Sequence, residues 1–352
     1  RGQPRRGGGS RAGAAVSAGL DILAAGLGVS VQDAGRPGHR SIGVPLSGAL
    51  DPLLLAAANH LAGNGPEVAG LEVLLAAPTL RAAGGPVCVA LAGELAGRIA
   101  GAGGDIRPLA AWSAVVLQPG DTLQLGARGI GYLAVGGGLL TPPVLGSRSS
   151  YARAGLGVSV VAGGLLPCAS FAGDPQHALV ASPLRHPDGP IRVIPGPQAD
   201  HFTPAALAAF YAQPWTLSPA RDRMGLRLAG PRLAHVPGGA DIVSDGVTPG
   251  AIQVPADGQP IVLLADCQTV GGYPKIATVI RADLPRLAHL VPGAEVRFAA
   301  VDASQAAAAR AAQARLFADW RASLRPAARP GGIATEQLLA ANLAGAALRG
   351  DE

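Results

Sequence analysis

The sequence predicts a mainly β protein with a few helices, divided into two domains. Its 352 residues exceed what one hydrophobic core usually serves. Hydrophobic residues make up 49% of the chain and charged residues 14%, with 51 Gly and 31 Pro, which argues against a charged disordered chain and against a long helical bundle. Short apolar runs alternate with turn residues along most of the chain, as expected for short strands.

Residues 1–18 are predicted to be a disordered leader, because they are rich in Gly and their arginines are solvated. Residues 19–180 are predicted to form a first β-barrel domain. One helix interrupts its strands: Asp51 can cap this helix, Pro52 fits the first turn, and Gly63 stops it. The predicted strands of this domain are 72–75, 87–91, 122–125 and 130–135.

Residues 190–302 are predicted to form a second β-barrel domain, separated from the first by the charged, Pro-rich stretch 174–190. A helix capped by Thr203 follows its first strand. The predicted strands are 191–194, 242–243, 251–254, 261–264, 276–280 and 296–301.

Residues 303–352 are predicted to form a C-terminal helical segment. The Ala-rich stretch 304–324 has Leu316, Phe317 and Trp320 at helical spacing, so this stripe is expected to dock on a barrel. A last short helix is predicted at 335–348.

Composition argues against nucleic acid and membranes as partners. The net charge is +5, but Arg1, Arg5, Arg6 and Arg11 contribute four of these charges, and aromatic residues are only 3%. Neither a basic stripe nor a base-stacking platform can therefore be assembled. The long uncharged stretches are interrupted by Gly and Pro, so none predicts a membrane helix.

The cysteines predict a cytoplasmic protein. Cys88, Cys168 and Cys267 lie far apart, without the paired spacing of a zinc site or a redox dithiol. The seven histidines lack an HExxH pattern, and we predict no metal site. Export is the weaker alternative, because the Ala/Gly stretch after Arg5 and Arg6 is only weakly hydrophobic.

Segment 266–275 is the strongest candidate for a functional site, because an apolar strand delivers several polar groups onto a glycine loop. Lys275 is the single lysine among the 28 Lys and Arg residues, so composition bias alone would have placed Arg there. An ammonium at this position could bind an oxyanion, or act as an acid or base; the alternative is an ordinary surface lysine. Cys267 has no histidine near it in sequence and is interpreted as a packed thiol.

Two other segments combine Arg with Asp. Asp33 and Arg36 lie among residues that bend the backbone, and Asp222 and Arg223 are adjacent. A guanidinium commonly holds a carboxylate or phosphate. The alternative, which the sequence alone favours, is an ion pair that fixes a turn. No GxxxxGK[ST] loop is present, and no GxGxxG opens a helix.

Ordered motifs run from about residue 20 to residue 302: SVQD at 30–33, GRPG at 35–38, GVP at 43–45, SGA at 47–49, LGSRS at 145–149, VIPGPQ at 193–198, DRMG at 222–225, PGAIQVP at 249–255 and GGYP at 271–274. Together they resemble the carboxyltransferase-domain family, which includes the C subunit of 5-oxoprolinase, the second subunit of allophanate hydrolase and the matching half of the urea carboxylase carboxyltransferase domain. The resemblance implies two cyclophilin-like β-barrels and a sister subunit as partner.

By resemblance, the chain is expected to be one subunit of an ATP-dependent 5-oxoprolinase, which opens the lactam of 5-oxoproline to glutamate. ATP rests on the resemblance alone; phosphorylation of the amide oxygen would make the lactam reactive toward water. We predict Lys275, Asp266 and Asp222 as catalytic residues. The predicted substrate- or nucleotide-binding residues are Asp33, Arg36, Arg148, Ser149, Gln198, Arg223, Gln253, Gln268 and Tyr273.

Two alternatives stay open. The first is a carboxyltransferase or allophanate-hydrolase-type subunit that uses carboxybiotin. Biotin would have to arrive on another protein, because Lys275 is not flanked by Met and no other lysine exists to carry it. The second is a non-catalytic regulator that binds a kinase inhibitor.

Overall fold

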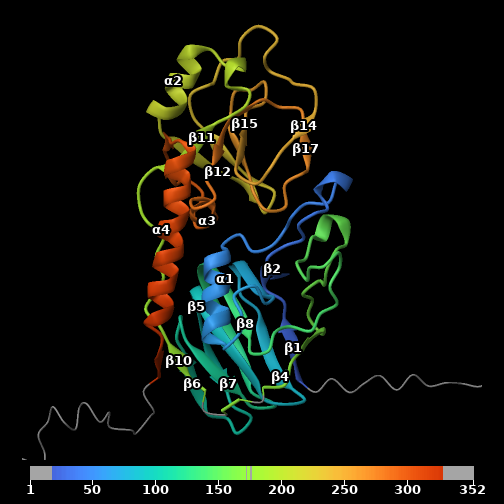
Figure 1. Ribbon diagram of the computed structural model, residues 1–352. Coiled ribbons are helices and arrows are strands. Elements are labelled where there is room, and N and C mark those ends of the chain that lie inside the picture. The colour runs from blue at the N-terminus through green and yellow to red at the C-terminus, as the bar shows by residue number, and fades with distance from the viewer. Residues whose placement is uncertain (1–17, 172, 175–176, 328–352) are drawn as a thin grey trace, which may run out of the picture.

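The computed structural model describes residues 18–171, 173–174 and 177–327. Their strands form two large sheets, one curled into a half-barrel and the other into a nearly closed barrel. The sheets are stacked end to end, and one long helix runs beside both (Figure 1). The prediction of a mainly β chain with a few helices is therefore confirmed.

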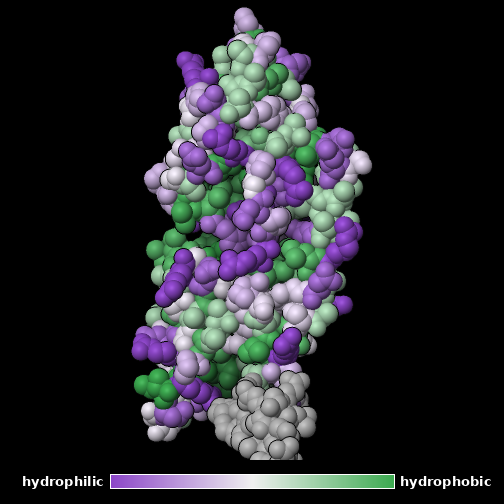
Figure 2. Space-filling view, turned by 90° about the vertical axis from the view of Figure 1, so that its left-hand side faces the viewer, coloured by the Kyte–Doolittle hydropathy of each residue, from purple (hydrophilic) through white to green (hydrophobic). Residues whose placement is uncertain are grey.

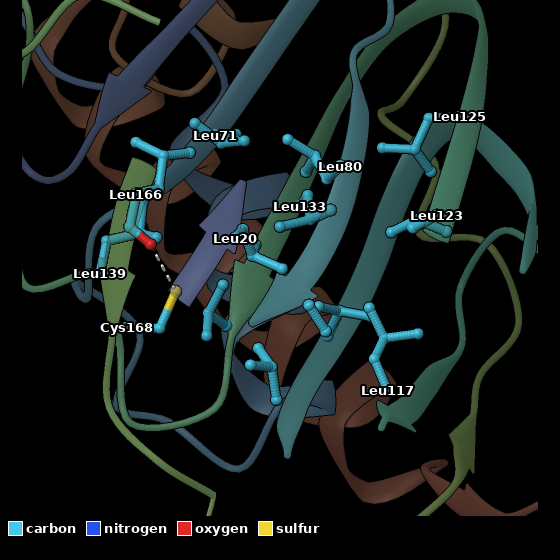
Figure 3. Close-up of a cluster of buried hydrophobic side chains, with 14 of the residues drawn as sticks. Leu20, Leu71, Leu80, Leu117, Leu123, Leu125, Leu133, Leu139, Leu166 and Cys168 are labelled. Carbon is cyan, nitrogen blue, oxygen red and sulfur yellow. Dashed lines mark hydrogen bonds between the residues drawn. The ribbon is translucent and has the colours of Figure 1, made fainter. Parts of the chain in front are cut away.

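The first sheet follows the order β2-β3-β8-β4-β1-β9, and β5 pairs with β6, β7 and β8. Its inner face is a core of Leu, Val and Ile side chains from most of these strands (Figure 3). The strands are β1 (Ala18–Ala24), β2 (Leu27–Gln32), β3 (Gly70–Ala76), β4 (Thr79–Ala83), β5 (Val87–Ala100), β6 (Ile106–Leu109), β7 (Ala114–Leu117), β8 (Thr122–Val135) and β9 (Leu165–Cys168).

The predicted separate strands at 122–125 and 130–135 are one continuous strand, β8. The glycines between them do not break β8, because it pairs with β5 on both sides of a bulge between Gly93 and Leu95. Gly131 is required there for space, since a Cβ on Gly131 would clash with Leu95 Cγ.

We expect Gly131→Ala to lower the free energy of unfolding by about 1–3 kcal/mol, because the added methyl group overpacks the contact with β5. Gly126→Ala is the matched control in the same strand, since the nearest atom to its added Cβ is 4.0 Å away. Urea unfolding of both variants measures the difference. Equal stability of the two variants would contradict the close approach.

Helix α1 (Pro52–Leu61) packs on β5 and β8 beside the first sheet. It begins as predicted: the Asp51 side chain accepts hydrogen bonds from Leu53 N and Leu54 N at 3.0 and 3.2 Å. Such a cap satisfies backbone donors that the helix itself leaves free.

Ala18, assigned to the leader from sequence, is the buried first residue of β1, and residues 1–17 lie outside the described ranges.

The second sheet follows the order β19-β12-β13-β16-β15-β18-β11-β20, and a small ribbon of β14 and β17 lies apart from it. Its strands are β11 (Ile191–Pro195), β12 (Trp215–Asp222), β13 (Gly225–Ala229), β15 (Ala251–Gln253), β16 (Ile261–Leu263), β18 (Lys275–Val279), β19 (Glu295–Val296) and β20 (Phe298–Ala300), with β14 (Asp245–Gly246) and β17 (Val270–Gly271) in the ribbon. Helices α2 (Pro204–Ala212) and α3 (Leu284–Ala288) pack against this sheet, and Thr203 caps α2 as predicted. We call the parts of the chain built on the first and second sheets the first and second domain. Short 3-10 helices are also present: η1 (Arg40–Ile42), η2 (Ala152–Ala154) and η3 (Ala199–His201).

The predicted strand at 242–243 is wrong. These residues are irregular, and Val243 is exposed. Ile242 N donates a single backbone hydrogen bond to Gly272 O, but no ladder forms around it until β14 begins at Asp245. A pair of β-branched residues is too short to form a strand without a neighbour.

Helix α4 (Ala303–Ala322) runs along both domains (Figure 1). Trp320 docks it as predicted: its ring lies 6.0 Å from that of Trp112, and its Nε1 donates to Ser182 O at 2.8 Å. Leu316 is exposed instead of packed. Figure 2 shows the face that α4 covers, with hydrophilic side chains crossing its middle.

Strand β10 (Leu179–Val180) pairs with β21 (Arg325–Pro326) beyond the end of α4. The helix predicted at 335–348 lies outside the described residues. Among the helices that the structure describes, none has the length and apolar character needed to cross a membrane.

Candidate functional site

The predicted site residues lie along the junction between the two domains. The loop after β2 reaches the second domain, where Ser47 N donates to Ala265 O at 3.0 Å. In the same loop, the Arg40 side chain donates to Val247 O and, at 3.1 Å, to Gln268 O. This contact places motifs that are some 220 residues apart in sequence next to one another. The predicted residues fall into three groups.

The first group, which we call the lysine cluster, consists of Lys275, Asp245, Gln198, Gln253 and Gln268. Lys275 begins β18, and its Nζ donates to Asp245 Oδ2 at 2.5 Å and to Gly246 O at 3.1 Å. The Lys275 side chain is 5% exposed and the Asp245 side chain 55%. The hydrogen bond from Lys275 lowers the pKa of Asp245. The alternative of an ordinary surface lysine is therefore wrong.

Three glutamines are linked to the backbone of Lys275 or to one another beside it. Gln198 Oε1 accepts from Lys275 N at 3.2 Å, and Gln253 pairs with Lys275 across β15 and β18. Gln268 Nε2 donates to Gln253 Oε1, and Gln253 Nε2 donates to Tyr273 O, both at 3.4 Å. The structure thus brings together five of the predicted residues, among them Tyr273, whose side chain is exposed.

A glycine makes room for this arrangement. A Cβ on Gly271 would lie 2.5 Å from Gln253 Nε2, so a larger residue in this loop would displace the amide. The physical reason for glycine at this position is therefore close approach of the loop backbone to a polar side chain.

The second group joins the loop after β2 to the loop at 147–150. Asp33 accepts hydrogen bonds from Ser147 Oγ and Ser149 Oγ, each at 2.6 Å, and from Arg148 N at 2.5 Å. Arg36 is fully buried and donates to Ser149 O; burial lowers its pKa. Asp33, Arg36 and Ser149 are thus engaged in holding two loops together.

Arg148 lies at a cavity of about 430 Å³ beside this group. Its side chain donates to Thr141 O, and Asp33 and Glu67 also line the cavity. The cavity carries carboxylates as well as a cation, so its electrostatics do not specify an anion.

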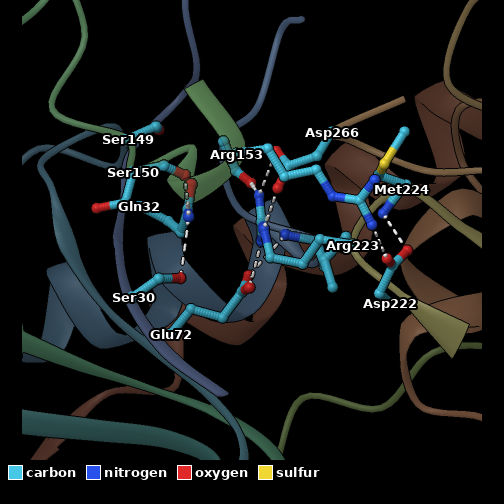
Figure 4. Close-up of polar contacts among 12 residues, drawn as sticks. Ser30, Gln32, Glu72, Ser149, Ser150, Arg153, Asp222, Arg223, Met224 and Asp266 are labelled. Atoms are coloured by element: carbon cyan, nitrogen blue, oxygen red, sulfur yellow. Dashed lines mark hydrogen bonds and ion pairs between the residues drawn. The ribbon is translucent and has the colours of Figure 1, made fainter. Parts of the chain in front are cut away.

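The third group crosses the junction as a buried ion-pair network (Figure 4). Arg223 Nε lies 2.8 Å from Asp266 Oδ2, and Arg223 Nη1 pairs with Glu72 of β3. Arg223 Nη2 donates to Gly48 O at 2.6 Å. Burial alone would lower the pKa of Arg223, but Glu72 and Asp266 raise it above its usual range. Tyr132 donates its hydroxyl to Glu72 at 2.6 Å.

Asp222 stands beside this network but takes no part in it. Its Oδ1 accepts from Met224 N and Gly225 N in the turn between β12 and β13, at 2.8 and 3.2 Å. Its Oδ2 pairs with the exposed Arg153 at 2.9 Å. These contacts favour a structural role for Asp222, and those of Asp266 with Arg223 favour the same, over the catalytic role predicted from sequence.

A cavity of about 330 Å³ lies against this third group between the domains. Its lining is mostly apolar, with Leu50 and Leu74 from the first domain and Leu264 from the second. It is separate from the lysine cluster, none of whose residues line it.

Sequence reasoning missed Asp245 and Arg40. Asp245 precedes a glycine in a turn-rich stretch, where an acidic residue usually caps a turn. Its role depends on Lys275, which lies 30 residues away. Arg40 lies between two family motifs, and the signal that could have singled it out is its position in a loop otherwise rich in motif residues.

Cys267 is buried, as predicted, and so are Cys88 and Cys168. Burial raises the pKa of Cys88 and of Cys168 to about 12, and it also raises the pKa of Cys267.

We therefore expect the native protein to react with Ellman's reagent at pH 8 far more slowly than the guanidinium-unfolded protein, which should titrate three thiols. Fast reaction of one native thiol would contradict the burial of all three cysteines.

Comparison with protein families matches residues 42–300 to the carboxyltransferase domain, subdomain A and B. The chain is 36% identical to the 5-oxoprolinase C subunit of Escherichia coli, over 86% of this chain and 98% of that protein. It is 35% identical to the 5-oxoprolinase C subunit of Haemophilus influenzae, over 83% and 94% of the two chains.

The fold also matches a larger solved protein. The crystal structure of the Kluyveromyces lactis urea carboxylase superposes with a TM-score of 0.74 at 25% identity. The match covers 86% of this chain but 29% of the urea carboxylase. The present chain thus spans less than a third of that enzyme's length.

Proposed function

The chain belongs to the carboxyltransferase-domain family, and we propose that it is one subunit of an ATP-dependent 5-oxoprolinase. One observation carries this proposal: the similarity extends over nearly the whole length of two bacterial 5-oxoprolinase C subunits, whereas it covers a minor part of urea carboxylase. The reaction converts 5-oxoproline, ATP and two water molecules into glutamate, ADP and phosphate.

The lysine cluster has the polar groups that a cyclic amide with a carboxylate requires. Amide side chains offer both N–H donors and carbonyl acceptors, which can pair with the N–H and C=O of a lactam. Gln198 and Gln268 are partly exposed, so their amides are accessible from solvent. An ammonium has three N–H donors, and Asp245 and Gly246 use two of those of Lys275. The third remains for a substrate oxygen.

In the proposed reaction, the γ-phosphoryl group of ATP moves to the lactam oxygen. Two water molecules then hydrolyse the phosphorylated lactam. The first attacks the activated carbon, so that the ring C–N bond breaks and the nitrogen takes up a proton, and the second releases phosphate from the acyl phosphate that remains. Negative charge gathers on oxygen during both steps, and a fixed cation that faces this oxygen lowers the barrier. We assign that role to Lys275, with Asp245 holding the ammonium in place.

We assign ATP binding to the assembled enzyme and not to particular residues of this chain. Arg36 is fully buried and Arg223 largely so, and protein groups engage both of these predicted nucleotide-binding residues. Moving either of them to a triphosphate would break the contacts that join the loops and the domains. Sister subunits are therefore part of the proposal.

The urea carboxylase similarity favours a second candidate, carboxyl transfer from carboxybiotin. Lys275 does not fit a biotin-carrying lysine, because its side chain is 5% exposed and paired with Asp245. Biotin would come on another protein, and the lysine cluster would then hold a carboxylate.

The test is to co-express the chain with its sister subunits and to incubate the purified complex with 5-oxoproline and ATP. We expect equal amounts of glutamate and ADP, unaffected by avidin, which traps biotin. Loss of turnover on adding avidin would favour carboxyl transfer. A stable complex without turnover of 5-oxoproline would overturn the proposal and favour a regulatory role.

A further inference from the structure

A carboxylate at the N-terminus of α1 and two histidines, one of them at the C-terminus of α3, meet at the domain junction; Figure 1 shows these two helices. His186 Nε2 lies 2.6 Å and His289 Nε2 2.7 Å from the same oxygen, Asp51 Oδ2. The three potential ligand atoms all lie within 4.8 Å of one another. We call His186 and His289 the histidine pair, and Asp51 supplies its carboxylate.

The carboxylate is held in place through both of its oxygens. Asp51 is fully buried, and its Oδ1 is engaged by the first backbone N–H groups of α1, which leaves Oδ2 directed at the two imidazoles. Burial alone would raise the pKa of Asp51, but the hydrogen bonds from His186 and His289 hold it well below its usual range. The backbone of Asp51 is held as well, because Asp51 N donates to the Tyr132 hydroxyl at 2.8 Å.

The two histidines come from other parts of the chain. His186 lies in the segment between the domains, and His289 follows α3 in the second domain. Their side chains are 12% and 30% exposed, so the group is shielded but can be reached from solvent. Their ring centroids are 5.3 Å apart, close enough for both rings to face a common point.

Two imidazole nitrogens and one carboxylate oxygen are a donor set that suits borderline divalent metals, above all Zn²⁺, and that leaves a fourth position for solvent. We propose that Asp51, His186 and His289 bind one divalent transition-metal ion of this class. No sequence spacing predicted it, because its ligands are separated by more than 100 residues.

The geometry requires little change to accept the ion. The Nε2–Oδ2 separations are hydrogen-bond distances, whereas ligand atoms in a tetrahedral site with bonds of about 2.0 Å lie roughly 3.3 Å apart. A shift of each ring by less than about 1 Å therefore suffices. On metal binding, each imidazole gives up the Nε2 proton that it donates to Asp51 and carries a proton on Nδ1, so that Nε2 offers its lone pair to the ion.

Bound metal would fasten the first domain to the second, because it would hold α1, the interdomain segment and α3 together. The expected consequence is a higher melting temperature in the presence of metal, since an ion that binds the folded state stabilises that state. This effect does not depend on the 5-oxoprolinase proposal.

The test uses the untagged full-length chain, stripped of metal by chelator and dialysed. Titration with Co²⁺ is expected to give one equivalent bound, with the visible absorption of a tetrahedral ion, and Zn²⁺ should displace it and raise the melting temperature. His186→Ala and His289→Ala should each lose the absorption and the thermal shift. His39→Ala, which alters a partly exposed histidine outside the group, should keep both.

Wild-type protein that takes up no stoichiometric Co²⁺ or Zn²⁺ would overturn the proposal, whatever the variants do. So would folded His186→Ala and His289→Ala proteins that bind like the wild type. If an alanine variant fails to fold, His186→Gln and His289→Gln supply the comparison, because an amide can retain a hydrogen bond to Asp51 but is a poor metal ligand.

Discussion

Replacing Lys275 by methionine is expected to lower the kcat of the assembled enzyme by at least about 100-fold, because the variant lacks the fixed cation that faces the reacting oxygen. Methionine fills similar space, and Asp245 is exposed enough to be hydrated once its partner is gone. The free energy of unfolding should therefore change little. Glutamate formation and urea unfolding, measured on the same preparation, separate the two effects.

Lys275→Arg is expected to restore little of this activity. The longer, planar guanidinium does not reproduce the two contacts that the compact ammonium of the buried Lys275 side chain makes with Asp245 and Gly246. Arg81→Met is the control, since Arg81 forms an exposed ion pair with Asp21 in the first domain. Full activity of Lys275→Met would show that the lysine cluster is not the site of chemistry.

Arg223→Met is expected to lower the free energy of unfolding by about 3–5 kcal/mol, because it leaves buried carboxylates without their shared cation. Glu72 is fully buried and Asp266 nearly so, and they lie on opposite domains. Urea unfolding monitored by tryptophan fluorescence measures the loss. We also expect partial unfolding of one domain before the other, since Arg223 connects the two.

A second substitution tests the reason for this loss. Adding Glu72→Gln to Arg223→Met removes one of the carboxylates left without a partner. The loss of unfolding free energy in the double variant should therefore be smaller than the sum of the losses in the two single variants. Arg153→Ala, which breaks the exposed pair with Asp222, should cost no more than about 1 kcal/mol. Equal costs for Arg223→Met and Arg153→Ala would contradict the buried network.

Local signals in the sequence were sufficient for α1, α2 and α4 and for strands such as β3, β11 and β16, but not for α3 or for strands such as β1, β12 and β13. The caps at Asp51 and Thr203 could be predicted because each is a short-range pattern, a side-chain oxygen followed by proline at the first helical position. The length of β8 was not predictable in this way. Its glycines indicate a break, but its pairing with the equally long β5 continues through them.

The candidate site was predictable where a chemically reactive side chain lies within one of the sequence motifs. Lys275 was singled out as the one lysine, and the structure places two of the predicted glutamines, Gln198 and Gln253, next to its backbone. Arg223 and Asp266 were also singled out, but sequence could not show that Glu72 completes their network across the junction. The histidine pair was missed for the same reason, because folding alone brings its segments together.

The most direct test of the central claim, that this chain is one of the subunits of a 5-oxoprolinase, is a subunit-omission assay. The sister subunits and this chain are purified separately, with host subunits removed, and ATP-dependent glutamate formation from 5-oxoproline is measured for each part and for the mixture. We expect turnover by the complete mixture and none by this chain alone or by the sister subunits without it. Undiminished turnover without this chain, or robust turnover by this chain alone, would contradict the account.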